Sequence, residues 1–373
     1  MFLSRGPGAL CVYRHPGAGR IFALRFLTTR SYDPLRILFC GSDEFSIASL
    51  KALHKEHSPI VPIKAAATEL SLPIHEIDTF RGWTLPTLAG GPINLIVAVS
   101  FGLFVPARIL NGVQYGGLNV HPSLLPDLRG PAPLHHTLLA GRTRTGVTLQ
   151  TLDLKRFDHG VILDQTPSPG FEIPNPDSCT VPQLLDFVAP KGARMLVDGI
   201  RKGVFVPPVD EHRWCPSEGD KPLIHAAKIQ TEDRHIDWAN WTLAEVNKRK
   251  RVLGPLWSKA LVAKDHSAGV PSFQQRRIIF TEMEEVQPTP DSRAFSLVPG
   301  LPFVDGIAPI EPREGKSLYV FTQDGKLVRV DQMKVEGEPN ADAVRAAFKA
   351  RMVGDRTFSS GTSKYTPFYN PLQ

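Results

Sequence analysis

Residues 118–130 read LNVHPSLLPDLRG, and this stretch organises the chain around it. Its apolar residues alternate with Asn119 and His121, so the amide and the imidazole project from the same side of a strand. Pro122 has no backbone N–H to donate, which limits how far the strand continues as a paired one. A neutral hydrogen-bond donor and a titratable group therefore leave the strand together. In an open α/β sheet, ligands bind at such strand ends.

The length and composition predict a globular protein with two ordinary domains. The chain has 373 residues, of which 42% are hydrophobic and 21% are charged. No run approaches the ~18 apolar residues of a spanning helix, so we expect no membrane partner. The four scattered cysteines lack the paired spacing of a disulfide framework or zinc site. His135 and His136 are adjacent and would diverge on a helix, so we predict no metal site.

The positive charge is concentrated in residues 1–34. This segment carries five arginines and one aspartate, a net charge of +4 out of +6 for the chain. Arginines among apolar and hydroxyl residues, with few acids, are typical of a mitochondrial presequence. The alternative is a basic tail that carries no targeting signal. We predict a presequence at residues 1–34 and a location in the mitochondrial matrix.

Alternating strand and helix patterns over residues 35–203 predict one doubly wound α/β domain. A near-continuous apolar run at residues 94–100 is typical of a central strand that is covered on both faces. The other expected strands are residues 35–40, 73–77, 118–120, 145–152 and 161–165. The expected helices are residues 45–57, 62–70, 106–110, 134–139 and 181–202.

The alternation breaks between the first two expected helices. Residues 58–62 are too short and too rich in proline to supply the strand that belongs there. Either the sheet departs from simple alternation at this point, or a segment is absent from the sequence.

A proline-rich and polar stretch at residues 204–224 predicts a linker to a second domain at residues 225–373. After an expected helix at residues 243–253, several strands follow without helices between them. This pattern favours a small antiparallel barrel or sandwich, which a helix at residues 341–352 closes.

Three side chains are candidates for catalysis. Asn119 can stabilise a developing oxyanion through its amide donors, and His121 can move a proton near neutral pH. Asp158, which lies between two expected strands, can orient or balance that imidazole. The set suits acyl transfer to an acceptor amine that itself attacks. On composition alone, Asn119 and His121 as ordinary loop anchors remain the alternative.

The run Lys248-Arg249-Lys250-Arg251 has two interpretations. It could bind phosphate groups, or it could be the solvated face of a helix.

The motifs at residues 118–126 and 129–130 closely resemble the signature of 10-formyltetrahydrofolate-dependent formyltransferases. Asp158-His159-Gly160 matches the Asp-x-Gly element of that family, and residues 101–106 resemble its folate-pocket loop. Residues 131–133, 225–229 and 236–238 are most similar to the branch that formylates methionyl initiator tRNA. The resemblance extends from about residue 35 to the end of the chain.

The resemblance implies a doubly wound formyltransferase domain and an oligonucleotide-binding-like β-barrel. It implies 10-formyltetrahydrofolate as co-substrate, initiator methionyl-tRNA as partner, and a monomer without metal. It further implies that Asn119, His121 and Asp158 are catalytic. The implied folate-binding residues are Phe101, Gly102, Leu103, Ser123, Leu124, Leu125 and Pro126. The implied tRNA-binding residues are Arg129, Lys248, Arg249 and Arg251.

One departure from the family falls at residues 58–62. The family has a second strand there and a basic, glycine-rich loop that reaches the tRNA acceptor stem. Exon skipping or an error in the gene model would remove both.

Two other functions therefore stay open. One is formyl transfer to a small amine such as glycinamide ribonucleotide, or to water in a formylfolate hydrolase. The other is an inactive RNA-binding relative.

Overall fold

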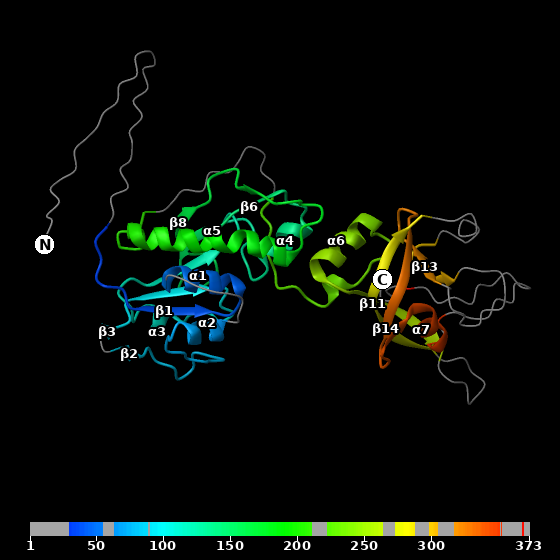
Figure 1. Cartoon of the computed structure of the whole chain (residues 1–373), viewed down its shortest axis with the longest axis horizontal. Coiled ribbons are helices and arrows are strands. Elements are labelled where there is room, and N and C mark those ends of the chain that lie inside the picture. Colours follow the sequence, from blue (N-terminus) through cyan, green and yellow to red (C-terminus); the bar gives the residue numbers. More distant parts are fainter. Residues whose placement is uncertain are drawn as a thin grey trace, which may run out of the picture.

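A computed structural model describes residues 30–54, 63–88, 90–210, 222–263, 273–287, 298–304 and 317–350, together with Met352 and Phe368. These residues form two main sheets, each with helices packed against it (Figure 1). Most of the expected presequence and the whole of residues 58–62 lie outside the described residues.

The first sheet is built around β4 (Leu95–Val99), whose five side chains are all buried. This confirms the central strand. The parallel neighbours of β4 are β1 (Ile37–Gly41) and β5 (Gly117–His121). The antiparallel strand β7 (Thr148–Thr151) pairs with β5, and β8 (Ile162–Gln165) pairs with β7. The order is β1-β4-β5-β7-β8, so the sheet is mixed.

Helices cover both faces of this sheet, as the doubly wound pattern predicts. Alternate residues of β4 pack with α1 (Glu44–His54) and α5 (Val181–Lys202) on one face. The residues between them pack with α3 (Ala107–Leu110) on the other face. The prediction left the strand directions open, and β7 runs antiparallel to β5. Side-chain alternation does not reveal this, because a strand shows the same period in either direction.

Helix α5 has the bounds that the sequence predicts. Thr180 and Gln183 form a capping box at its start, and Gly203 ends it with φ of +67°. The shorter helices of this part are α2 (Ile63–Glu69) and α4 (Pro133–Leu139). Within the described ranges, no helix has both the length and the apolarity to cross a membrane.

The strand expected at residues 73–77 is wrong. Most of its side chains are exposed, and Pro73 lacks an N–H for a ladder. Instead, the two-residue strands β2 (Thr87–Leu88) and β3 (Gly91–Pro92) pair with each other. A second such pair joins β6 (Arg144–Thr145) to β9 (Phe171–Glu172).

The second sheet is antiparallel throughout and follows the order β10-β11-β14-β13-β12, with β15 paired to β14. Its strands are β10 (Leu256–Ala263), β11 (Phe273–Val286), β12 (Phe303–Val304), β13 (Leu318–Phe321), β14 (Leu327–Val335) and β15 (Asn340–Asp342). Helix α7 (Ala343–Lys349) packs on β14. The described pairings do not join β10 to β12, so this part is a sheet-rich region without a closed barrel.

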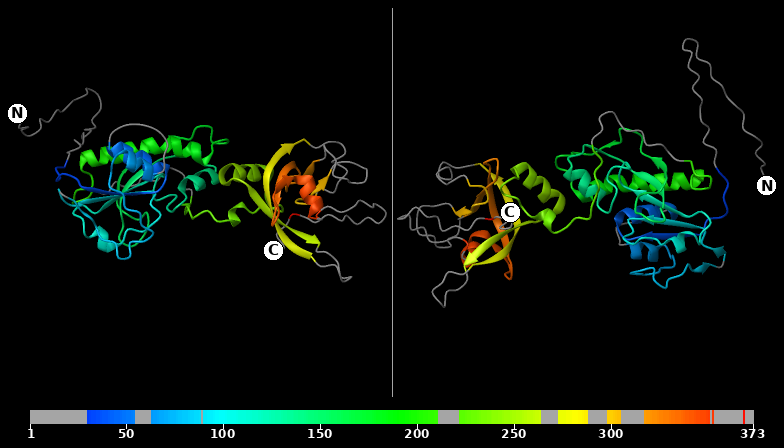
Figure 2. Two further views of the ribbon diagram at one scale, coloured as in Figure 1. Left: turned by 60° about the horizontal axis from the view of Figure 1, so that its bottom comes forward. Right: turned by 180° about the vertical axis from the view of Figure 1, so that it is seen from behind.

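Helix α6 (Leu243–Leu253), preceded by the 3₁₀ turn η1 (Glu232–Arg234), lies between the two sheets in every view (Figures 1 and 2). Its last residues, Val252 and Leu253, belong to the core of the first sheet. Leu243 and Val246, near its start, belong to the core of the second sheet. One helix therefore contributes to both cores.

Candidate active site

The exit of β5 places the first two candidates as the sequence predicts. Leu118 and Val120 point into the core, so Asn119 and His121 project from the opposite face. Asn119 is half-buried and His121 is only 5% exposed.

Asp158 comes from the β7–β8 loop and meets both of these side chains. Its Oδ1 accepts a hydrogen bond from Asn119 Nδ2 at 3.0 Å and lies 3.4 Å from His121 Nδ1. Its Oδ2 accepts the backbone N–H of Gly130 at 3.1 Å. The φ of Asp158 is +54°, a region that non-glycine residues rarely adopt and that is often found at functional sites. The structure therefore brings the three predicted catalytic residues together.

The charge of Asp158 is stabilised despite its burial. Burial by itself raises the pKa of this carboxyl group. The hydrogen bond and charge of His121, with the donors Gly130 and Gln150, outweigh that effect and lower the pKa below its usual value. Asp158 is therefore an anion at neutral pH.

A backbone carbonyl fixes the tautomer of His121. The Nε2 atom lies 2.9 Å from the carbonyl oxygen of Leu128, which can only accept, so Nε2 carries a hydrogen. The other nitrogen, Nδ1, donates to Asp158 only in the doubly protonated ring. Leu128 itself has φ of +61° and donates its N–H to Ile224 at 2.8 Å. That backbone bond helps to hold the carbonyl in place.

Sequence reasoning missed the contact that the residues just after the expected linker make with the proline loop. Ala226 accepts an N–H from Ala132 and donates its own to Arg129, so this segment lies along the proline loop. The approach is close at Gly130, whose φ is +124°, and a Cβ there would lie 2.4 Å from the oxygen of Ala226. No local pattern marks this contact, which joins positions almost a hundred residues apart.

Gln150 is the second omission. It lies directly opposite Asn119 in the β5–β7 ladder, and its Nε2 donates to Asp158 Oδ1 at 3.1 Å. The sequence feature that could have revealed it is an amide side chain on the polar side of the alternating strand expected at residues 145–152.

The three catalytic candidates line a cleft of about 870 Å³ at the edge of the sheet. Each face of the sheet supplies one apolar part of its wall. One part is formed by Phe45, Val120, Leu134, Val181 and Leu185. The other part is formed by Ala98, Phe101, Leu103, Val105 and Leu152.

Ionisable groups complete the wall of the cleft. Burial raises the pKa of Asp43, although the N–H of Ser46 opposes that effect. Burial lowers the pKa of His135, and the nearby positive charges of His136 and Arg234 lower it further. His135 is therefore neutral at physiological pH.

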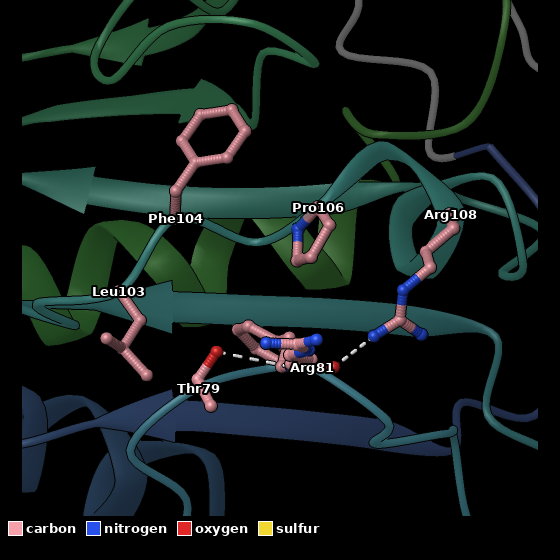
Figure 3. Close-up of a pocket in the computed structure, with 7 residues that line it drawn as sticks. Thr79, Arg81, Leu103, Phe104, Pro106 and Arg108 are labelled. Carbon is pink, nitrogen blue, oxygen red and sulfur yellow. Dashed lines mark hydrogen bonds between the residues drawn. The ribbon is translucent and has the colours of Figure 1, made fainter.

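The predicted folate residues separate into two groups. Phe101, Gly102 and Leu103 line the cleft. Leu103 and its neighbour Phe104 also line a smaller cavity of about 360 Å³, shown in Figure 3. There Arg108 donates to the carbonyl groups of Phe80 and Trp83.

The second group, residues 123–126, is not part of the cleft lining. Ser123 and Leu125 are each 1% exposed, and Thr148 binds the backbone of both. Gln165 also donates to the carbonyl of Leu125 at 2.8 Å. This segment packs against β7 and β8 because its backbone hydrogen bonds are satisfied there.

The predicted tRNA-binding residues also separate. Arg129 lines the cleft and donates from Nε to the carbonyl oxygen of Asp158 at 2.8 Å. Lys248 and Arg249 form ion pairs with Glu245. Arg251 binds the carbonyl of Cys179 at 3.1 Å. The basic run is therefore engaged within the molecule.

The described residues contain no group of three or more His, Cys, Asp or Glu side chains arranged to hold a metal ion. The site consists of an amide, an imidazole and a carboxylate in a cleft with apolar walls. Such a set can stabilise an oxyanion and move a proton.

Comparison with known proteins assigns this fold and site to a class. A family model described as "Formyl transferase" matches residues 88–178, which contain all three catalytic candidates. The mitochondrial methionyl-tRNA formyltransferase of Homo sapiens is 33% identical over 245 residues, covering 60% of this chain and 58% of the relative. The mitochondrial enzyme of Saccharomyces cerevisiae is 31% identical over 296 residues, covering 63% of this chain and 73% of the relative.

Among solved structures, the N-formyltransferase of Helicobacter canadensis, determined with folinic acid and dTDP-3-aminofucose, aligns with a TM-score of 0.45 and 13% identity. The alignment covers 80% of this chain and 99% of that one.

The chain belongs to the methionyl-tRNA formyltransferase family. It spans 58% of the length of the mammalian relatives from Bos taurus and Homo sapiens.

Proposed function

We propose that the protein transfers a formyl group from 10-formyltetrahydrofolate to the amino group of methionyl initiator tRNA. The convergence of Asn119, His121 and Asp158 in one cleft carries this proposal. The names of the relatives support methionyl-tRNA as the acceptor and the mitochondrion as the location. With the basic N-terminal segment, they support the matrix.

In the proposed reaction, the methionyl nitrogen attacks the formyl carbon, and a C–N bond forms. The carbonyl oxygen becomes an oxyanion. Asn119 Nδ2 donates one of its two hydrogens to Asp158, so the second can bind this oxyanion. His121 in its protonated form adds positive charge beside it.

The intermediate then collapses as the bond from the formyl carbon to N10 of the folate breaks. One proton leaves the attacking amine, and one reaches N10, so the reaction balances. Asp158 can carry that proton directly or through a water molecule, because it is an anion next to His121. Its buried setting favours short proton transfers over exchange with bulk water.

The two parts of the cleft wall suit two substrates. We assign the part with residues 101–103 to the folate, as the resemblance implies, and the part beside Phe45 and Leu185 to the aminoacyl group. Residues 123–126 would support the site from behind. Arg129, at the cleft, would bind a phosphate near the tRNA 3′ end.

We propose residues 1–34 as presequence, 35–203 as the catalytic domain, 204–224 as linker and 225–373 as the tRNA-binding domain. For that last part we propose an oligonucleotide-binding-like fold, which its antiparallel strands support, although the described strands form an open sheet. Lys248, Arg249 and Arg251 would act mainly by holding α6 in place, because each has an intramolecular partner.

The test presents the purified chain and formyltetrahydrofolate with methionyl initiator tRNA, with glycinamide ribonucleotide, or with no acceptor. We expect formyl product on the tRNA alone, with one tetrahydrofolate released for each formyl group. Product on the ribonucleotide, or tetrahydrofolate and formate without an acceptor, would support the other formyltransferase functions. Absence of turnover with cooperative unfolding and RNA binding would support the inactive relative.

A further inference from the structure

Gln150 occupies a distinctive place on β7. It is 1% exposed, lines the cleft and stands opposite Asn119 in the ladder with β5. The pairing of β7 with β8 shifts register between Leu149 and Gln150. Such irregularities next to active sites redirect a side chain.

The two ends of the Gln150 amide are in unequal situations. Its Nε2 donates to Asp158 Oδ1 at 3.1 Å, beside the 3.0 Å bond from Asn119. Its Oε1 is buried and has no hydrogen-bond partner among the described residues. A buried acceptor without a hydrogen-bond partner is destabilising. The opposite orientation would place Oε1 against the carboxylate.

We propose that Gln150 is a positioning residue for Asp158, a role that rests on the proposed formyl transfer. With Asn119 it forms a clamp of two amides from neighbouring strands, and both amides donate to the same carboxylate oxygen. The clamp stabilises the anionic form of Asp158 and orients its carboxylate toward His121. The amide keeps its costly orientation because only Nε2 can serve the carboxylate.

The other groups around Asp158 define what a variant would change. His121 and Gly130 also face the carboxylate, and Arg129 binds its carbonyl oxygen. Arg156 is a further cation on this wall of the cleft, and His159 lies beside it with a pKa that burial and the charges of Arg129 and Arg156 lower. All of these remain in a Gln150 variant, so the effect of removing one donor can be isolated.

The test compares Gln150→Met, which keeps length and volume but cannot donate, with the wild type. We expect kcat/KM to fall about tenfold to a hundredfold, the worth of one hydrogen bond to a charged group. Loss of a donor to the anion raises the pKa of Asp158, so the acid limb of the pH profile should move to higher pH. Gln150→Glu, which places a second carboxyl group there, should move it further.

Gln165→Met is the matched control. Gln165 is a buried amide on β8 whose Nε2 binds Leu125 and Thr148 rather than Asp158. We expect a lower Tm for this variant without movement of the acid limb. A Gln150→Met enzyme with a lower Tm or lower activity but the acid limb of the wild-type pH profile would overturn the proposal. Gln150 would then have a structural role only.

A wild type without formyl transfer would refute the proposed function but still allow this test. The carboxyl ¹³C shift of Asp158, assigned with Asp158→Asn, would report its titration directly. A higher midpoint in Gln150→Met would support the positioning role, and an unchanged midpoint would overturn it.

Discussion

Replacing Asp158 by asparagine removes the charge at the centre of the site without changing its volume. The attraction between the carboxylate and a protonated His121 at 3.4 Å is about 5 kcal/mol at an effective dielectric constant of about 20. The new NH₂ group must also face either Gly130 or both Asn119 and Gln150, which leaves at least one donor unpaired. Each 1.36 kcal/mol is a factor of ten, so we expect kcat to fall by about 10²–10⁴.

Single-turnover formyl transfer from labelled formyltetrahydrofolate measures this loss in the chemical step. Folate binding, followed by fluorescence, should change little, because the apolar walls of the cleft are untouched. Asp164→Asn is the matched control, since Asp164 is a carboxylate on β8 outside the cleft lining. It should keep wild-type kcat.

Two results would refute this reasoning. Asp158→Asn with kcat within a factor of three of wild type would show that the charge does not act in the reaction. A large loss in Asp158→Asn that Asp164→Asn reproduces would point to general destabilisation.

Three further predictions concern stability and binding. Gly160→Ala should destabilise the fold by about 3 kcal/mol or more, because a Cβ there would lie 1.6 Å from the oxygen of Thr151; a denaturant midpoint equal to wild type would contradict this. Arg129→Ala should lower the slope of log KM for tRNA against log salt by about 1. Arg249→Ala should lower Tm and keep the wild-type slope. The reverse pattern would assign the tRNA contact to α6. Because the folded-state pKa of Asp158 lies below its ordinary value of 3.8, its charge stabilises the fold above that pH, and this contribution is lost as the pH falls through the folded-state pKa. The free energy of unfolding of wild type should therefore exceed that of Asp158→Asn near neutral pH and approach it in acid; a difference that grows in acid would contradict the assignment.

The sequence was sufficient where the information is local. Period-two alternation placed Asn119 and His121 on one side of β5. The position of Asp158 between two expected strands made it a candidate, and the family motif then matched it. The apolar pattern of residues 181–202 predicted both ends of helix α5. The central strand β4 followed from an uninterrupted apolar run.

What the sequence could not provide are contacts between distant segments. Strand β7 runs antiparallel to β5, and alternation carries no sign of direction. Ala226 binds the proline loop through backbone atoms, which leave no trace in side-chain patterns. The basic residues of α6 look free in sequence, yet Glu245 and the carbonyl of Cys179 engage them in the fold.

The strand expected at residues 73–77 failed for a related reason. Its two isoleucines, Ile74 and Ile77, would point to opposite sides of a strand, and most of the segment is exposed. A short apolar segment forms a strand only where one face can be buried.

The most direct test of the central claim follows two labels in one turnover. Wild-type protein in excess is mixed with [¹⁴C]formyl-tetrahydrofolate and [³⁵S]methionyl initiator tRNA. Both labels should appear together in formylmethionyl-tRNA, at one formyl group per methionine. Recovery of the ¹⁴C as formate, or in unreacted folate, with methionine left unformylated would contradict the claim.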